Sequence, residues 1–282
     1  MFIVDNLEQY RILDAGDGDK LESWNGIIMS RPDPQVIWNR EHEGLWNDAS
    51  AEYIRSSKGG GEWKIRRKLP EDWILEELGM RFKVKPTGFK HMGLFPEQAY
   101  NWQFIMEHVR EGDNFLNLFA YTGGASVAAA KAGAKVTHVD ASKGIVQWAK
   151  ENAELSSIPG DRIRYIVDDC LKFVQREYRR GRKYEAIIMD PPSYGRGANK
   201  ELWKLEDTIE ELIIECVKIL SDDARLFILN SYTTGLSNIV TRNLLQKHLG
   251  GRGGQIEADD LAIPIEDSKL FLPCGATARW YV

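Results

Sequence analysis

Residues 114–126 read Asn-Phe-Leu-Asn-Leu-Phe-Ala-Tyr-Thr-Gly-Gly-Ala-Ser, and this stretch decides the fold class. Phe115 to Phe119 form a short apolar run, which is typical of a buried strand. The run breaks at Thr122-Gly123-Gly124, and the small residues of 125–133 predict a helix that a glycine ends. This order of strand, glycine turn and helix is typical of a nucleotide pocket in an open α/β sheet. Glycine lets a ligand approach the backbone, and the helix N-terminus directs free N–H groups into the same space.

On both sides of this stretch, apolar strands alternate with helices. Besides 115–119, we expect strands at 135–139, 162–167, 184–189, 224–230, 255–262 and 277–282. Helices are expected at 97–109, 142–155, 170–180, 205–220 and 236–248, with Ser142 as the N-cap residue of the second. Strands separated by helices of this length predict βαβ units. The fold class is therefore α/β, with a Rossmann-like, doubly wound, mainly parallel seven-stranded sheet.

The first 68 residues have a different pattern. Short strand-like segments at 9–13, 36–38 and 62–65 are separated by Gly, Asp, Asn and Pro, and four of the nine tryptophans lie here. We expect a small antiparallel β module over residues 1–68 and a second domain over 69–282. At the start of that second domain, 70–79 predicts a short helix and 80–85 a strand.

Residues 55–68 combine a glycine turn, basic residues (among them Lys58) and Trp63. One interpretation is a site for an RNA backbone, with a base stacked on Trp63. The other is a solvated hairpin with no ligand, since basic hairpin tips are common on protein surfaces.

Composition limits the function classes. The net charge of −5 does not favour a protein that coats nucleic acid. Three cysteines far apart, Cys170, Cys216 and Cys274, argue against a disulfide framework or a zinc cluster, and the five histidines are scattered. We therefore expect no metal site. The sequence has no apolar run of about 20 residues and no signal-peptide pattern at its start, so we expect a cytoplasmic protein without a membrane segment.

Acidic residues follow three of the predicted strands: Asp140, the pair Asp168-Asp169, and Asp190. The carboxyl ends of parallel strands meet at one rim, where ligands bind. Asp140 lies about twenty residues beyond the glycines, where an acid can accept hydrogen bonds from ribose hydroxyls. The adjacent Gly123-Gly124 is not the Gly-x-Gly-x-x-Gly that cradles a pyrophosphate. This favours a phosphate-free nucleoside such as S-adenosylmethionine over NAD, with Asp168 or Asp169 near the adenine amine.

Asp190 is followed directly by Pro191 and Pro192. Two consecutive prolines fix an extended turn with few donors of its own, which can hold a reacting methyl group and its acceptor side by side. The simpler interpretation is that the prolines only end the strand. The alignment of the other acidic strand ends favours the interpretation in which the prolines have a functional role.

At these residues the chain resembles the class I S-adenosylmethionine-dependent methyltransferases. More narrowly, it resembles the bacterial 23S ribosomal RNA large-subunit methyltransferases, which modify cytosine C5 or guanine N7. The resemblance covers roughly residues 79–230. It rests on the family's first motif at 117–126, the ribose motif at 139–142, the adenine-side motif at 168–170 and the acceptor-side motif at 190–194. Thr87-Gly88-Phe89 and 97–101 resemble the segment that precedes this core.

The resemblance implies S-adenosylmethionine as cofactor, RNA as substrate, and two groups of site residues. The cofactor-binding group is Phe89, Phe95, Gln98, Asn117, Phe119, Tyr121, Gly123, Asp140, Ala141, Ser142, Asp168, Asp169 and Cys170. The catalytic group, on the acceptor side, is Asp190, Pro191, Pro192 and Tyr194, with Asp190 and the prolines orienting the acceptor and Tyr194 stacking on a base.

The sequence departs from the family's cytosine-C5 members at 230–233. Those members use a cysteine after the fifth strand as nucleophile, whereas this chain has Asn230-Ser231-Tyr232-Thr233. A hydroxyl is far less ionised than a thiol near neutral pH, so we expect a nitrogen acceptor instead of cytosine C5.

The amino-terminal module also does not look like the RNA-binding module of many relatives. Three alternatives therefore stay open: a small-molecule or protein methyltransferase, which the pI of about 5.7 supports, a non-catalytic cofactor-binding RNA assembly factor, and a nicotinamide dehydrogenase. Near the end of the chain, Phe271 and Arg279 either line the substrate mouth or pack in the core.

Overall fold

The computed structural model describes residues 1–56, 60–196, 202–232 and 236–282. The chain divides into two compact units. One comprises Met1, 101–261 and 275–282, and the other comprises 2–100 and 262–274. The last two strands, β16 (Gln255–Pro264) and β17 (Phe271–Tyr281), have residues in both units.

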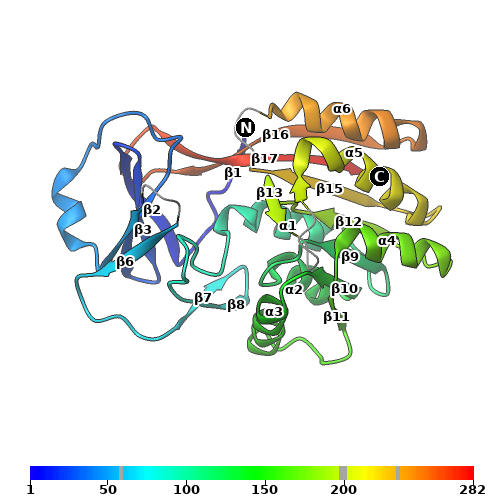
Figure 1. The fold of residues 1–282 in the computed structure, drawn as a ribbon, viewed down its shortest axis with the longest axis horizontal. Coiled ribbons are helices and arrows are strands. Elements are labelled where there is room, and N and C mark those ends of the chain that lie inside the picture. Colours follow the sequence, from blue (N-terminus) through cyan, green and yellow to red (C-terminus); the bar gives the residue numbers. More distant parts are fainter. Residues whose placement is uncertain (57–59, 197–201, 233–235) are drawn as a thin grey trace. The chain divides into compact units, whose positions relative to one another are not determined.

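The larger unit is built on a mainly parallel sheet (Figure 1). The strand order is β1-β16-β17-β15-β12-β9-β10-β11, so the short β1 adds an eighth strand to the seven that the sequence predicts. Strands β9 to β12 and β15 are parallel, and β17 pairs antiparallel with β15. The predicted Rossmann-like α/β class is confirmed. The strand bounds are β1 Phe2–Ile3, β9 Asn114–Leu118, β10 Lys135–Asp140, β11 Ile163–Val167, β12 Ala186–Met189 and β15 Leu226–Ser231.

Helices cover both faces of this sheet, as a doubly wound fold requires (Figure 1). One face carries α1 (Ala99–His108), α2 (Gly124–Lys131) and α3 (Lys143–Leu155). The other carries α4 (Cys170–Arg179), α5 (Leu205–Ile219) and α6 (Asn238–Leu249). A short 3-10 turn, η3 (Gly250–Arg252), follows α6. Among the described residues, no helix is both long enough and apolar enough to cross a membrane.

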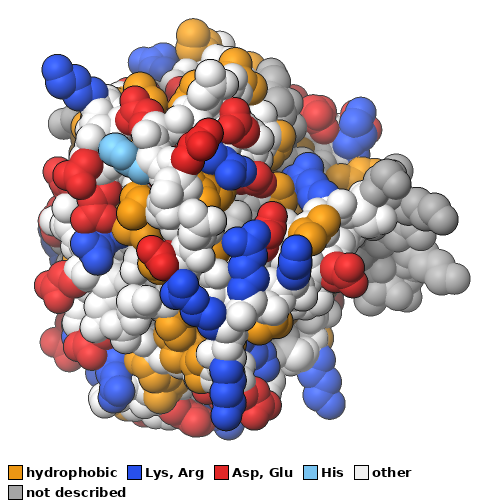
Figure 2. Space-filling view, turned by 90° about the vertical axis from the view of Figure 1, so that its left-hand side faces the viewer, with side chains coloured by type: hydrophobic (Ala, Val, Ile, Leu, Met, Phe, Trp, Pro, Cys, Tyr) orange, Lys and Arg blue, Asp and Glu red, His pale blue; other side chains and the backbone are white. Residues whose placement is uncertain are grey.

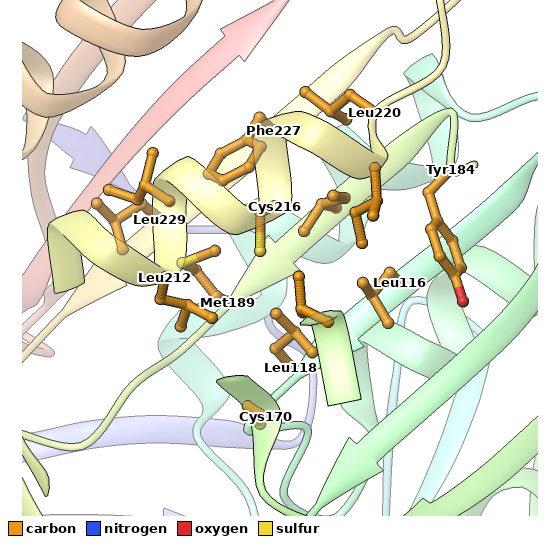
Figure 3. Close-up of a cluster of buried hydrophobic side chains, with 14 of the residues drawn as sticks. Leu116, Leu118, Cys170, Tyr184, Met189, Leu212, Cys216, Leu220, Phe227 and Leu229 are labelled. Carbon is orange, nitrogen blue, oxygen red and sulfur yellow. The ribbon is translucent and has the colours of Figure 1, made fainter. Parts of the chain in front are cut away.

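Apolar side chains fill the space between the sheet and α4–α6. Figure 3 shows side chains of β9, β12 and β15, such as Leu118, Met189 and Leu229, directed towards Leu212 and Cys216 of α5. Each fully buried side chain of this size contributes about 1.5–3 kcal/mol relative to an exposed one. This core fixes the strand ends that carry the acidic residues.

The other unit contains a five-stranded sheet in the order β2-β3-β4-β5-β6. Its neighbours pair antiparallel except β4 and β5, which are parallel, so the predicted small β module is confirmed. The predicted boundary at residue 68 stays a prediction, because this compact unit continues to Tyr100 and includes 262–274. The elements are β2 Tyr10–Gly16, β3 Asp19–Trp24, β4 Ile27–Pro32, η1 Glu43–Asp48, β5 Ala51–Arg55, β6 Gly61–Ile65 and η2 Pro96–Gln98.

Two local predictions in this unit are wrong. Residues 36–38 are not a strand. The helix expected at 70–79 is instead the first strand of a hairpin formed by β7 (Trp73–Glu77) and β8 (Met80–Val84). Leu78 and Gly79 form the turn with φ of +53° and +67°. Glu77 is buried and accepts backbone N–H groups of Glu8, Gln9 and Tyr10 at 2.7, 2.8 and 2.9 Å, so distant backbone donors outweigh local helix propensity.

Candidate functional site

The acidic strand ends of the larger unit meet at the topological switch point of its sheet. Strand β9 lies between β10 and β12, with Leu118 opposite both Val139 and Met189. The register continues past the strands, because Asp190 N–H donates to the Leu118 carbonyl at 3.3 Å. The loop after β9, Asp140 after β10 and Asp190 after β12 therefore lie on one rim, where open α/β sheets bind ligands.

The loop after β9 has an unusual backbone. Phe119, Tyr121 and Gly123 have left-handed φ values of +53°, +49° and +90°. Left-handed aromatic residues are strained by about 1–3 kcal/mol each, and such strain is concentrated at functional sites. Gly123 is the N-cap residue of α2, and a Cβ there would lie 3.0 Å from the Ala149 Cβ. Only glycine satisfies both the conformation and the space.

The Asp140 carboxylate is held by backbone donors on both oxygens. Its Oδ2 accepts the Tyr121 N–H at 3.0 Å, and its Oδ1 accepts the Ser142 N–H at 2.9 Å. Burial raises the pKa of Asp140, and these two hydrogen bonds oppose that rise. Each oxygen of an ionised carboxylate has a second acceptor position. The fixed carboxylate can therefore accept two further hydrogen bonds, as ribose hydroxyls would supply.

Ala141 and Ser142 are exposed beside this carboxylate. Ser142 is the N-cap residue of α3, as predicted, but its side chain makes no capping hydrogen bond. Instead, the Asp140 carboxylate accepts the backbone N–H of Ser142 at the start of the helix.

The adenine-side residues follow β11 and begin α4. Asp168 N–H donates to the Asp140 carbonyl at 3.1 Å, which brings the ends of β10 and β11 together. The Asp168 carboxylate pairs with Arg176, and Asp169 caps α4 by accepting the Lys172 N–H at 2.9 Å. Both acids therefore already have protein partners.

Cys170 is buried directly beneath the loop after β9. Its sulfur accepts the Phe119 N–H at 3.3 Å, and burial raises the pKa of the thiol well above its usual range. This neutral thiol holds the strained backbone from below and is not available as a nucleophile.

Asn117 lies in the buried part of β9. Its Nδ2 donates to the Ser126 Oγ at 2.9 Å, and that oxygen lies 3.0 Å from His138 Nδ1. Burial lowers the pKa of His138 to about 3, so the imidazole is neutral. This Asn117–Ser126–His138 chain ties β9 to the start of α2. The sequence analysis missed the chain because its members are up to 21 positions apart.

On the acceptor side, Asp190 is followed by buried Pro191 and exposed Pro192. The Pro192 carbonyl accepts Trp203 Nε1–H at 2.6 Å. Tyr194 begins β13 (Tyr194–Arg196), which pairs with β14 (Leu202–Lys204), and its side chain is 59% exposed. An exposed aromatic next to a rigid proline turn is suited to stack on a base.

Trp203 is a site residue that sequence analysis missed. Its ring centroid lies 5.0 Å from that of Phe119, and its N–H holds Pro192, so it joins the two sides of the rim. An aromatic residue shortly before the helix that follows Asp190-Pro-Pro was the available signal.

Phe89, Phe95 and Gln98 belong to the other compact unit. Phe89 is 67% exposed, Gln98 is buried, and the Phe95 ring packs edge-on against His91 at 5.4 Å. Their predicted contact with the cofactor stays a prediction. Trp63, on which one interpretation stacks a base, donates its indole N–H to the carbonyls of Thr87 and Phe89 at 2.9 and 3.2 Å.

Two basic residues of the segment at 55–68 form ion pairs within the protein. Arg66 pairs with Glu52 at 2.5 Å and Arg67 with Asp48 at 3.0 Å, while Lys58 lies outside the described residues. Figure 2 shows the face of the molecule that carries the amino-terminal β module, where Lys and Arg are interspersed with Asp and Glu. These two ion pairs reduce the positive charge that the segment offers to an RNA backbone.

A cavity of about 550 Å³ also lies in this unit, lined by Arg40, Trp46 and Arg66 among others. The Arg40 guanidinium stacks on Trp46 at 3.7 Å and donates to Asp19 at 3.1 Å. Its two lining arginines are thus paired within the protein, and the cavity has none of the acidic strand ends, so the chemistry is assigned to the rim of the large sheet.

The sequence matches the family model described as S-adenosylmethionine-dependent methyltransferase over residues 52–221. The chain is 35% identical to ribosomal RNA large subunit methyltransferase K/L of Shewanella frigidimarina over 215 residues, which are 76% of this chain and 28% of the relative. It is 32% identical to ribosomal RNA large subunit methyltransferase K of Neisseria meningitidis serogroup B over 226 residues, 77% of this chain and 64% of the relative. The chain thus spans less than two thirds of either relative.

Among solved structures, the chain is similar to a SAM-dependent methyltransferase from Agrobacterium tumefaciens. The two are 36% identical, and the TM-score is 0.94 over 99% of this chain and 92% of the other.

Proposed function

The chain belongs to the S-adenosylmethionine-dependent methyltransferases, and from this premise we propose that it methylates a nitrogen atom of a nucleobase in ribosomal RNA. One observation carries the proposal. Asp140, with both oxygens fixed by backbone donors, and Asp190, followed by two prolines, stand on the same rim at the switch point of the sheet.

The residues of this rim suit S-adenosylmethionine. Asp140 would accept the ribose hydroxyls, and Gly123, which has no side chain, would let the cofactor approach the backbone at the start of α2. Asp168 or Asp169 would accept the adenine amine. By the family resemblance, Phe89, Phe95 and Gln98 would complete the cofactor site.

When bound, S-adenosylmethionine supplies an electrophilic methyl group, and the transfer is a displacement whose chemistry belongs to the cofactor. The chain's own residues align the acceptor. Asp190 would accept a hydrogen bond from an amino or ring N–H of the base, the two prolines would keep the turn rigid, and Tyr194 would stack on the base. Alignment of this kind lowers the activation barrier by several kcal/mol, and by about 7–11 kcal/mol in the best cases.

The thiols support a nitrogen acceptor over cytosine C5. None of the three cysteines lies in 230–233, the stretch that begins with the last two residues of β15. Burial raises the pKa of the Cys170 and Cys216 thiols, and Cys274 belongs to the other unit. Cytosine C5 chemistry needs a thiolate at the base, and a nitrogen lone pair does not.

The names of the two curated relatives support ribosomal RNA as the substrate. A base in folded RNA has to leave its stack to reach the rim. A cytoplasmic location belongs to the same proposal. The second candidate is a small-molecule or protein acceptor, which the net charge of −5 favours.

Two measurements test the proposal. Calorimetry first gives the affinity for S-adenosylmethionine. Labelled cofactor is then incubated with ribosomal RNA from cells that lack this protein, and in parallel with their RNA-free extract. Label in the RNA supports the proposal, and label in the protein or small-molecule fraction supports the second candidate. Cofactor binding without transfer to any fraction would favour a non-catalytic assembly factor.

A further inference from the structure

A buried polar network lies beneath the carboxyl end of β15 in the larger unit. Asn101 of α1 is fully buried, and its amide oxygen accepts Nε–H and Nη2–H of Arg279 at 3.0 and 2.7 Å. Its amide nitrogen donates to Asn230 Oδ1 at 3.0 Å and to Thr277 Oγ1 at 3.3 Å. The Arg279 guanidinium also lies over the Phe104 ring at 4.2 Å.

The chemistry of arginine fixes the direction of the bonds that link Arg279, Asn101 and Asn230. A guanidinium has donors and no acceptor, so the Asn101 atom that faces Arg279 must be its oxygen. The opposite atom of Asn101 is then its NH2 group, which can only donate, so the Asn230 atom that faces it must be oxygen. Amide orientations are normally ambiguous, but here one cation determines both. Arg279 therefore decides which side of Asn230 carries its own NH2 group.

Asn230 stands next to the acceptor side of the rim. Strands β12 and β15 are parallel neighbours, with Met189 opposite Leu229. The next residues, Asp190 and Asn230, are therefore at the same position along the two chains. Met189 and Leu229 point into the core against α5 (Figure 3). Because side chains alternate along a strand, Asn230 points to the opposite face, where Asn101 meets it.

Arg279 is a costly choice for a packing residue. Its side chain is 1% exposed, and its Nη1 lies 3.6 Å from a carboxylate oxygen of Glu257. Buried ionic groups can often be replaced by apolar residues of similar volume without loss of stability. Packing alone therefore does not explain an arginine here, whereas the need for a group that only donates does.

We propose that Arg279 is a positioning residue, which acts through Asn101 to hold the Asn230 amide in one orientation beside Asp190. The role in catalysis rests on the proposed methyl transfer. The orientation itself is a property of the fold and can be measured without any substrate.

Matched substitutions at 279 test whether Arg279 controls the orientation of the Asn230 amide. Both bonds from Arg279 to Asn101 end on one oxygen, so a single donor is enough for that contact, and Arg279→Lys keeps a group that only donates. Arg279→Met keeps similar bulk without a donor. We expect Arg279→Lys to transfer methyl groups within about threefold of the wild type and Arg279→Met to lose roughly 10- to 100-fold at saturating cofactor and RNA. The cofactor dissociation constant stays within about twofold in both.

Asn101→Asp tests the second step of the relay. The carboxylate has the same shape and still accepts from Arg279, but it cannot donate to Asn230. We expect the same roughly 10- to 100-fold loss as in Arg279→Met. Thr277→Val is the control, because it removes one branch of the network and leaves the line from Arg279 to Asn230 intact, so transfer stays near the wild-type rate.

The side-chain NH2 resonances of Asn230 report its orientation independently of activity. We expect them to be unchanged in Arg279→Lys and Thr277→Val and shifted in Arg279→Met and Asn101→Asp. Unchanged resonances in the last two variants, or an equal loss of transfer in Thr277→Val, would overturn the proposal. If wild-type protein methylates no RNA, the proposed function fails, while these resonances still decide whether Arg279 orients Asn230.

Discussion

The Asp140 carboxylate accepts the backbone N–H of Tyr121 at 3.0 Å and so ties the end of β10 to the strained loop after β9. Its other oxygen takes the Ser142 N–H. In Asp140→Asn one of these N–H groups would face an NH2 group. We expect a loss of about 0.5–1.5 kcal/mol in the free energy of unfolding, because one backbone donor that is not fully buried loses its acceptor. Cofactor affinity, measured by calorimetry, should fall more than tenfold.

The control for that change is Asp161→Asn, at an exposed acid in the turn before β11. This substitution should alter neither the free energy of unfolding nor the cofactor affinity. Equal cofactor affinity in Asp140→Asn and wild type would exclude Asp140 as the ribose ligand.

Gly123→Ala should destabilise the fold and weaken cofactor binding together. The residue has φ +90°, and a Cβ would lie 3.0 Å from the Ala149 Cβ. The left-handed conformation alone costs alanine roughly 1–2 kcal/mol. In the matched change Gly144→Ala, the Cβ meets nothing within 4 Å, and the residue is in α3. That variant should be neutral or more stable by up to about 1 kcal/mol in urea unfolding. Equal midpoints for the two variants would contradict this account of the turn.

His138 should not titrate in the physiological range. Burial lowers its pKa to about 3 from the ordinary 6.5. The unfolded chain therefore binds a proton that the folded chain rejects. Burial of the neutral His138 therefore costs no stability above pH 6.5. The free energy of unfolding decreases as the pH falls from 6.5 towards about 3. Urea unfolding at pH 7.5 to 4.5 should show a steeper loss in wild type than in His138→Gln. An imidazole NMR titration with a midpoint near 6.5 would refute the assignment.

Asp190→Ala should leave the affinity for S-adenosylmethionine unchanged and reduce methyl transfer by roughly 100-fold or more, because the base loses its orienting acceptor. Single-turnover transfer of labelled methyl groups measures this. Transfer at the wild-type rate would remove Asp190 from the mechanism.

Tyr194 should act through its ring and not through its hydroxyl. Its side chain is 59% exposed at the start of β13. Tyr194→Phe should retain the KM for RNA, whereas Tyr194→Ala should raise it about 5- to 100-fold, as expected for the loss of one stacking contact of about 1–3 kcal/mol. A similar KM in both variants would exclude stacking.

The sheet and its acidic rim were predictable because their signals are local. The apolar runs of β9, β12 and β15 are buried on both faces, so they stand out in the sequence, and each acid directly follows its own strand. Once parallel strands were inferred, the convergence of Asp140, Asp168 and Asp190 followed from topology. The glycine turn at 122–124 was visible for the same reason, since glycine marks the conformation.

The contacts that hold this rim in place were not predictable from local patterns. The left-handed Phe119 and Tyr121 have no residue signature, because their conformation is imposed by Asp140 and Cys170. Arg279 meets Asn101 across 178 positions of the chain. The prediction of a helix at 70–79 was wrong because Glu77 accepts backbone N–H groups near Tyr10. These groups are 67 positions away in the sequence, which no local pattern can detect.

The identity of the methylated nucleoside tests the central claim most directly. Ribosomal RNA from cells that lack this protein is incubated with the wild-type chain and labelled S-adenosylmethionine, then digested to nucleosides and separated with mass detection. The account predicts that the label is in a single nitrogen-methylated nucleoside and that it is lost with Asp190→Ala. Label in 5-methylcytidine, or cofactor binding with no label in RNA, would contradict it.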